Sequence, residues 1–159
     1  MVAATEEWAL FFHLTGAFLF VGGAIVAAVA FEAARRRSAP GEIVLLLGLT
    51  RVGVALVGAG ALFVLPFGLW LVHLEHIGYG TAWVDAALAL FVVSGVVGAI
   101  AGQGPKRARG LAGELARAGH EETPELRTLL DDRPGRWLNY LSGLLVVAIV
   151  VLMVFKPGS

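Results

Sequence analysis

The chain has 159 residues, of which 58% are apolar and 15% are charged, and its mean hydropathy is +0.81. This composition is that of a membrane protein and excludes an ordinary soluble domain. The formal net charge is zero, and the absence of cysteine excludes disulfides, thiolate metal ligands and covalent heme attachment. Four spans and one loop account for nearly the whole length, so we expect residues 1–159 to form a single integral membrane domain.

The first apolar segment covers residues 8–31 and is long enough to cross a hydrocarbon core of about 30 Å. Glu6 and Glu7 precede it, and an arginine triplet at residues 35–37 follows it. A cleavable signal peptide has the opposite order of charge, with basic residues before the apolar stretch. We therefore expect this segment to remain as a helix with its N-terminus outside.

The second span is expected at residues 52–72, because Arg51 would sit at the membrane interface just before it. Pro66 lies inside this span and, since it lacks a backbone donor, predicts a kink. A short turn at residues 73–81 contains no Lys or Arg and leads to a third span at residues 82–102. The shortness of this turn predicts that spans two and three are antiparallel neighbours.

The longest loop, residues 103–136, contains the basic stretch KRARGLAGELARAG. Leu111 and Leu115 in this stretch have the i,i+4 spacing of an amphipathic surface helix, which we expect to lie on anionic lipid headgroups. The fourth span is expected at residues 138–155, with Trp137 at the depth of the membrane interface.

The positive charges mark every other loop. Of the twelve Lys and Arg residues, four lie at residues 35–51, seven at residues 106–136, and the last is Lys156. Because basic loops face the cytoplasm, we expect an all-α bundle of four transmembrane helices in a bacterial inner membrane, with both termini outside and the basic loops cytoplasmic. The lipid bilayer is its expected partner, and no nucleic-acid partner is expected.

Helices in lipid associate where small residues let their backbones approach. The first three spans are rich in small residues, whereas the fourth has Gly143 alone. We therefore expect spans one to three to pack tightly and span four to lie at the periphery. Alternatively, the small residues leave room for a flat cofactor, or they contact a partner subunit or a second copy of the chain. The small residues are Gly23, Ala27, Gly58, Ala59, Gly60, Gly95, Gly98, Ala99 and Gly102.

Ionisable side chains at membrane depth are costly and usually functional, so the few in this chain are the candidate site residues. His13 is the only one clearly inside span one. His73 and His76 end span two on the same side, three residues apart and so on one helix face. Asp85 begins span three at this end, and Glu75 is adjacent to the histidines. No motif fixes a reaction, which leaves open whether the protein is an enzyme.

Imidazole nitrogens are common ligands of heme iron and of transition metals. His13 paired with His73 predicts a b-type heme site near the outer face, suited to electron transfer, with Gly16 leaving space for the porphyrin. His13, His73, His76 and Asp85 predict instead a site for binding or transport of a metal ion such as copper. The third alternative is a cofactor-free structural subunit, in which His13 only hydrogen-bonds a neighbouring helix. The aromatic residues expected to flank a heme are Phe11, Phe12, Phe18, Phe63 and Trp70.

Several short motifs point to a family. They are the run FHLTGAFLFVGG in span one, Arg51, the run PFGLWLV in span two, and a Gly-Tyr-Gly turn followed by Trp83. Together they resemble an uncharacterised family of bacterial four-helix integral membrane proteins, known as a domain of unknown function.

More distantly, the histidine followed by Gly-Gly in span one is similar to the heme-binding, membrane-embedded protoporphyrinogen oxidases and to the membrane domain of copper-resistance D proteins. This resemblance implies a functional role for His13 and matches Arg51 to the basic residue that begins their second span. The oxidases have a lysine shortly after their tryptophan, where this chain has Trp83, Val84 and Asp85. The resemblance therefore implies heme binding rather than the oxidase activity.

Overall fold

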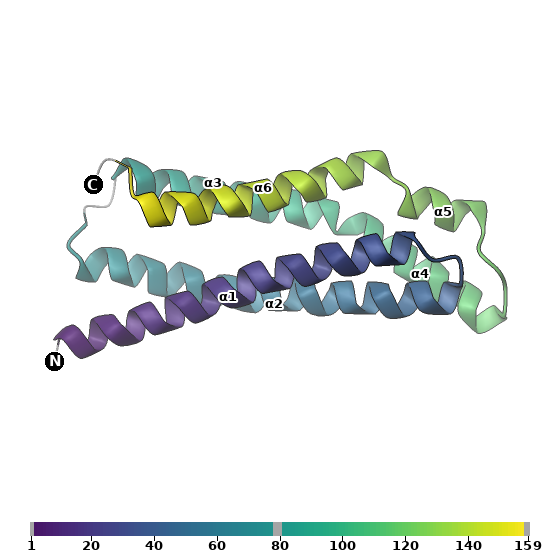
Figure 1. Ribbon diagram of the computed structural model, residues 1–159, viewed down its shortest axis with the longest axis horizontal. Helices are drawn as coiled ribbons and strands as arrows, with labels where there is room; N and C mark the ends of the chain where they lie inside the picture. Colours follow the sequence, from purple (N-terminus) through teal and green to yellow (C-terminus); the bar gives the residue numbers. More distant parts are fainter. Residues whose placement is uncertain (1, 78–80, 158–159) are drawn as a thin grey trace.

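A computed structural model describes residues 2–77 and 81–157, with side chains from Thr5 onward, and every element in these ranges is a helix (Figure 1). The glycines of the expected turn after span two lie at residues 78 and 80, outside the described residues. In chain order the helices are α1 (Val2–Arg35), α2 (Pro40–Leu74), α3 (Ala82–Ala101), α4 (Gln103–Ala118), α5 (Pro124–Leu130) and α6 (Arg133–Phe155).

Four helical stretches of the described chain are long and apolar enough to cross a membrane, which confirms the all-α, four-span architecture. They are Thr5–Arg35, Pro40–Leu74, Ala82–Ala118 and Pro124–Phe155. α1 has 34 residues and α2 has 35. At about 1.5 Å per residue each is about 50 Å long, well beyond the roughly 30 Å of a hydrocarbon core. Both helices are therefore long enough to project beyond the hydrocarbon.

The second helix begins twelve residues before the expected start of the span at residue 52. Pro40 occupies its first turn, where the missing backbone donor costs nothing, and the helix runs unbroken past the exposed Arg51. Ile43 and Leu47 in the added segment are buried. The early start therefore reflects packing against the rest of the protein.

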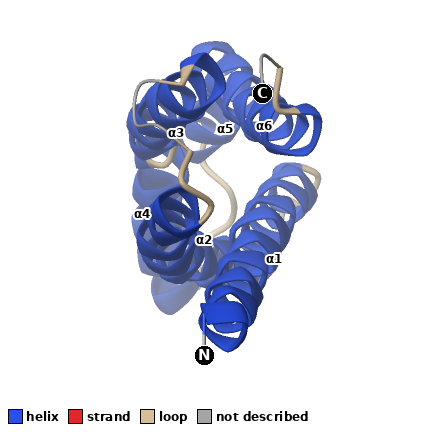
Figure 2. Ribbon diagram, turned by 90° about the vertical axis from the view of Figure 1, so that its left-hand side faces the viewer, coloured by secondary structure: helices blue, strands red, loops and turns tan. Residues whose placement is uncertain are grey.

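The helices form two antiparallel pairs, α1 with α2 and α3 with α6 (Figure 1, Figure 2). The expectation that spans one to three pack together with span four at the periphery is wrong. α2 and α3 do not form a helix pair, although they meet at the terminal end, where Val72 packs with Trp83 and Val84. The small residues of α3 do not face the first pair: Gly95 has no atom near its ideal Cβ position, and Gly98 faces Ser142 of α6 at 3.5 Å.

Glycines allow the backbones of α1 and α2 to come into direct contact. A Cβ added at Gly60 would lie 2.5 Å from the backbone nitrogen of Phe20, and one added at Gly53 would lie 2.6 Å from that of Ala27. Gly16 is equally close, since its Cβ would lie 2.6 Å from the Cβ of Phe63. Gly16 is therefore an interface residue, and the expectation that it leaves space for a porphyrin is wrong.

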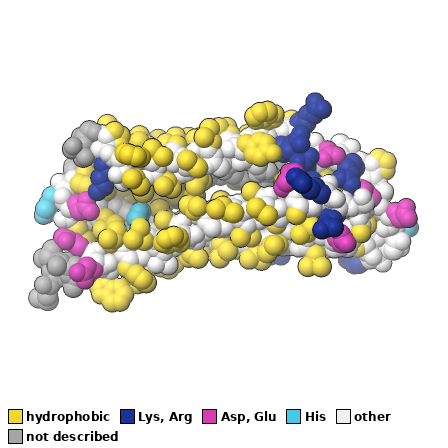
Figure 3. Space-filling model, in the orientation of Figure 1, with side chains coloured by type: hydrophobic (Ala, Val, Ile, Leu, Met, Phe, Trp, Pro, Cys, Tyr) yellow, Lys and Arg dark blue, Asp and Glu magenta, His cyan; other side chains and the backbone are white. Residues whose placement is uncertain are grey.

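We call the end that carries the start of α1 and the end of α6 the terminal end, and the opposite end the basic end (Figure 1). The Lys and Arg side chains gather at the basic end, whereas the middle of the visible face is hydrophobic (Figure 3). A hydrophobic cluster of α1, α2, α4 and α5 closes the basic end. Its buried members are Phe31, Ala34, Ile43, Leu47, Ala108, Ala112, Leu115, Leu126 and Leu130.

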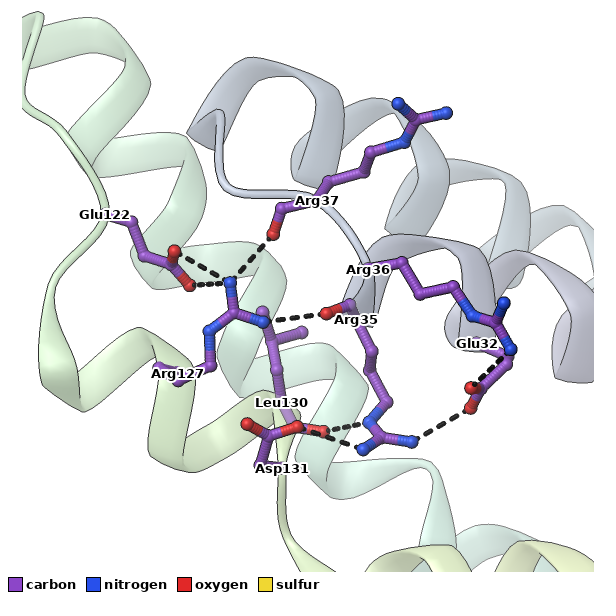
Figure 4. A network of polar contacts seen from close by, with 8 residues as sticks. All are labelled: Glu32, Arg35, Arg36, Arg37, Glu122, Arg127, Leu130 and Asp131. Carbon is purple, nitrogen blue, oxygen red and sulfur yellow. Dashed lines mark hydrogen bonds and ion pairs between the residues drawn. The ribbon is translucent and has the colours of Figure 1, made fainter.

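The amphipathic helix expected in the long loop is present as α4, but its apolar face packs on protein. Ala108, Ala112 and Leu115 are buried in the cluster at the basic end, and α4 packs on α2 and α5. The expectation that this face lies on lipid headgroups is therefore wrong. An arginine network joins α5 to the end of α1 in the same region (Figure 4).

Candidate functional site

A cavity of about 330 Å³ lies at the terminal end, lined by residues of α1, α2, α3 and α6. Its volume is at the low end of the range for small-molecule sites. The lining side chains that carry nitrogen or oxygen are His13, Glu75, Trp83 and Lys156, and the others are apolar. The two helix pairs are joined at the basic end and meet again at the terminal end, where Val72 packs with Trp83 and Val84, and the cavity lies beside this second contact.

The imidazole of His13 lies in the cavity wall and is hydrogen-bonded across the α1–α2 interface. Its Nδ1 is 3.0 Å from the backbone carbonyl oxygen of Val64. Because a carbonyl oxygen can only accept, Nδ1 carries the hydrogen, and in the neutral imidazole Nε2 then keeps its lone pair. The hydrogen bond to a neighbouring helix that the sequence offered as an alternative is thus present, and it fixes the tautomer whose other nitrogen can act as a ligand.

Gly68 determines how closely the imidazole of His13 approaches α2. A Cβ at this position would lie 2.9 Å from Cε1 and 3.0 Å from Nδ1 of His13. Any larger residue would push the ring away from the carbonyl of Val64. The sequence showed Gly68 only as part of the PFGLWLV run, and nothing in that run indicated that it faces a histidine.

The rim of the cavity carries three polar groups, of which the sequence indicates Glu75 as a candidate but assigns no site role to Trp83 or Lys156. Trp83 is only 7% exposed, and its indole Nε1 has no hydrogen-bond partner among the described residues. Lys156 Nζ lies 5.6 Å from the centre of the Trp83 ring and 3.4 Å from Oε2 of Glu75. Trp83 and Lys156 are far apart in the sequence, so only the pairing of α3 with α6 brings them together.

The other candidate ligands lie away from this cavity. His73, His76 and Asp85 are exposed, and none of them lines it. Among the described residues, no group of three or more His, Cys, Asp or Glu side chains is placed to hold a metal ion. The structure therefore brings His13 into a cavity without bringing the other three residues to it.

The aromatic residues expected to flank a heme do not line the cavity either. Phe12 stacks on Phe67 at 4.8 Å between ring centres and also on Phe63, so these rings pack on one another across α1 and α2. Trp83 and Phe91 are the aromatic residues of the cavity wall. The sequence could not show this arrangement, because position along a helix does not reveal which face a side chain occupies.

Four apolar spans, two helix pairs and a cavity with one half-buried histidine define a small helical integral membrane protein with a candidate ligand site inside the bundle. The chain belongs to the family described as "Predicted integral membrane protein (DUF2269)", whose model it matches over residues 8–157. No curated protein and no solved structure matches the chain. The more distant resemblance to heme-binding and copper-resistance families has no counterpart in these comparisons.

Proposed function

We propose that this protein is a b-type heme-binding redox or electron-transfer protein of the membrane, with His13 as a ligand of the iron. The observation that supports the proposal is the imidazole in the cavity wall, held by the carbonyl of Val64 at 3.0 Å. Histidines that bind metals almost always donate their other ring N–H to an acceptor of this kind. Nε2 of His13 is thereby the nitrogen left to coordinate iron.

The apolar lining of the cavity suits a porphyrin, whereas its volume of about 330 Å³ suits one less well. Its walls are largely apolar, and Trp83 and Phe91 contribute flat surfaces. α1 and α6 contact each other little, whereas Val72 of α2 packs with Trp83 and Val84 of α3 at the terminal end. Admitting a porphyrin would open this cluster and leave the glycine contacts between α1 and α2 intact. Bound heme would supply one-electron chemistry, and His13 would be its protein ligand because His73 does not line the cavity.

The charge distribution supports an orientation for the protein. Cationic side chains gather at the basic end (Figure 3). Basic segments of bacterial inner-membrane proteins stay in the cytoplasm, so we place the basic end there and both termini outside. The cavity would then lie in the outer half of the membrane.

The test is a visible absorption spectrum of the detergent-purified protein, expressed with added heme and recorded before and after dithionite. The proposal expects a Soret band and sharpened reduced bands that are lost in His13→Ala. His73→Ala and Arg107→Ala are the controls and should keep the spectrum, because neither residue lines the cavity. A helical, monodisperse protein without these bands, or a His13→Ala variant that retains them, would overturn the proposal.

The two alternatives from the sequence predict other results in the same preparation. A metal-ion site predicts bound metal without visible heme bands, and it has less support because the described residues contain no cluster of ligands. A cofactor-free subunit predicts a colourless protein that co-purifies with a membrane partner. Elemental analysis and mass spectrometry of the sample separate these two outcomes.

A further inference from the structure

We infer that the rim of the cavity is a carboxylate subsite, formed by the indole N–H of Trp83 and the ammonium group of Lys156. It would take the carboxylate of an amphiphilic ligand whose apolar body lies in the cavity. Heme has two propionates and belongs to this class, so for heme the inference rests on the proposed function. The subsite itself requires no iron and applies to any ligand of this shape.

The buried donor of Trp83 is the first observation. Nearly all buried polar groups in proteins have a hydrogen-bond partner, and the exceptions call for an explanation. Trp83 is 7% exposed, and its Nε1 has no acceptor among the described residues. Trp83 also lines the cavity, and a ligand oxygen that reaches its covered N–H from the rim would supply the missing acceptor.

The position of Lys156 is the second observation. It lines the same cavity, lies over the ring of Trp83, and is paired with Glu75 at 3.4 Å. Both side chains of this pair are partly exposed, Lys156 by 42% and Glu75 by 46%. Exposed ion pairs contribute little to stability, so a ligand carboxylate can replace or share the Glu75 contact at low cost. Among the described residues, the other carboxylates of this end, Glu6, Glu7 and Asp85, do not line the cavity.

The distance along α2 from the site of His13 to the rim indicates the length of the ligand. Val64, which holds His13, and Glu75 at the rim are eleven residues apart, or about 16 Å along a helix. The wall between them is apolar on α2, with Leu65, Leu69 and Val72 among its residues. The cavity is thus matched to an elongated apolar molecule with a carboxylate at the end nearer the rim.

The experiment compares metal-free protoporphyrin IX with its dimethyl ester, by porphyrin fluorescence titration of the detergent-solubilised protein. The two probes share the ring, and only the first carries carboxylates. We expect the acid to bind about tenfold more tightly, as one charge-assisted contact would give. Lys156→Met should remove this preference by weakening the acid alone. Trp83→Phe should weaken both probes by about fivefold, because the ester carbonyl also accepts a hydrogen bond.

Matched controls exist at the basic end. Lys106→Met removes an exposed lysine, and Trp137→Phe removes an exposed tryptophan, and neither residue lines the cavity. Both variants should bind like the wild type. Equal affinity of the wild type for acid and ester, a preference that survives Lys156→Met, or no binding of either probe would overturn the inference.

The titration is independent of the heme test because its probes hold no iron. If the heme bands are absent or survive His13→Ala while the acid remains preferred, the proposed function fails and the carboxylate subsite stands. If the bands depend on His13 but acid and ester bind alike, the subsite fails and the proposed function stands.

Discussion

The guanidinium of Arg127, in α5, donates a 2.7 Å hydrogen bond to the backbone carbonyl oxygen of Arg35, the last residue of α1. The final carbonyls of a helix have no partner within it, and a cation there also interacts favourably with the helix dipole. Arg127 further donates to the carbonyl of Arg37 at 3.0 Å and to Glu122 at 2.7 Å (Figure 4). One side chain therefore closes the end of α1 and attaches α5 to it.

We expect Arg127→Ala to destabilise the protein by about 1–3 kcal/mol, because it removes hydrogen bonds to Arg35 and Arg37 and leaves Glu122 without its cation. Thermal unfolding in detergent, followed by circular dichroism, measures the effect. The control is Arg117→Ala, since Arg117 is exposed and bonds only to Gly113 of its own helix among the contacts described. A similar loss in both variants would contradict the role of Arg127.

Arg35 and Arg36 are adjacent in the sequence, but we expect them to contribute differently to the stability of the protein. The side chain of Arg35 is 10% exposed and contacts Glu32, Asp131 and the carbonyl of Leu130. We expect Arg35→Ala to cost about 2 kcal/mol or more, because its partners lose a desolvated cation. Arg36 is 76% exposed, so Arg36→Ala should cost well under about 1 kcal/mol. Chemical unfolding of both variants in one detergent tests the difference, and equal midpoints would refute it.

The contact between α1 and α2 predicts that alanine substitution has opposite effects on stability at two glycines of α2. Gly60→Ala places a Cβ 2.5 Å from the backbone nitrogen of Phe20, so the helices must separate and the protein should lose at least about 2 kcal/mol. Gly58→Ala meets no atom within 4 Å, and alanine favours the helix, so stability should stay the same or rise slightly. Unfolding by titration with a denaturing detergent measures both. A tolerated Gly60→Ala would show that the backbones are not in contact.

Gly68→Ala tests the placement of His13 under the proposed function. The added methyl would collide with the imidazole and weaken the hydrogen bond to Val64. Loss of such a supporting interaction typically lowers metal affinity about 10–100-fold, so heme affinity should fall while the helical content stays constant. Gly22→Ala is the control, because no atom lies within 4 Å of its Cβ position. If Gly68→Ala binds heme with wild-type affinity, His13 is not a ligand of the iron.

Hydropathy and charge predicted the spans because a bilayer imposes one requirement on every spanning segment, namely an apolar length of about 20 residues. The pairing of the helices could not be predicted in this way. Gly60 and Gly95 look alike in sequence, yet one contacts a backbone and the other faces open space. The count of small residues carries no information about the face on which each will lie.

The site was predictable at His13, where an ionisable residue in an apolar run is itself the signal, and in part at Glu75, which was named beside the histidines. Trp83 and Lys156 come together only because α3 packs on α6, and no local sequence pattern predicts that contact. α5 was missed although its signal was present. Thr123 accepts a hydrogen bond from the backbone N–H of Leu126, with Pro124 in the first turn, which is a helix start.

The glycine contacts of the first pair join only α1 and α2. During synthesis this hairpin therefore needs no later part of the chain and can close once residue 74 has reached the membrane. The cluster at the basic end must wait for Leu126 and Leu130 of α5. We expect assembly to proceed in that order, and a fragment ending at Leu74 should already form cross-links between cysteines that replace Phe12 and Phe67, whose rings stack across this pair at 4.8 Å between centres.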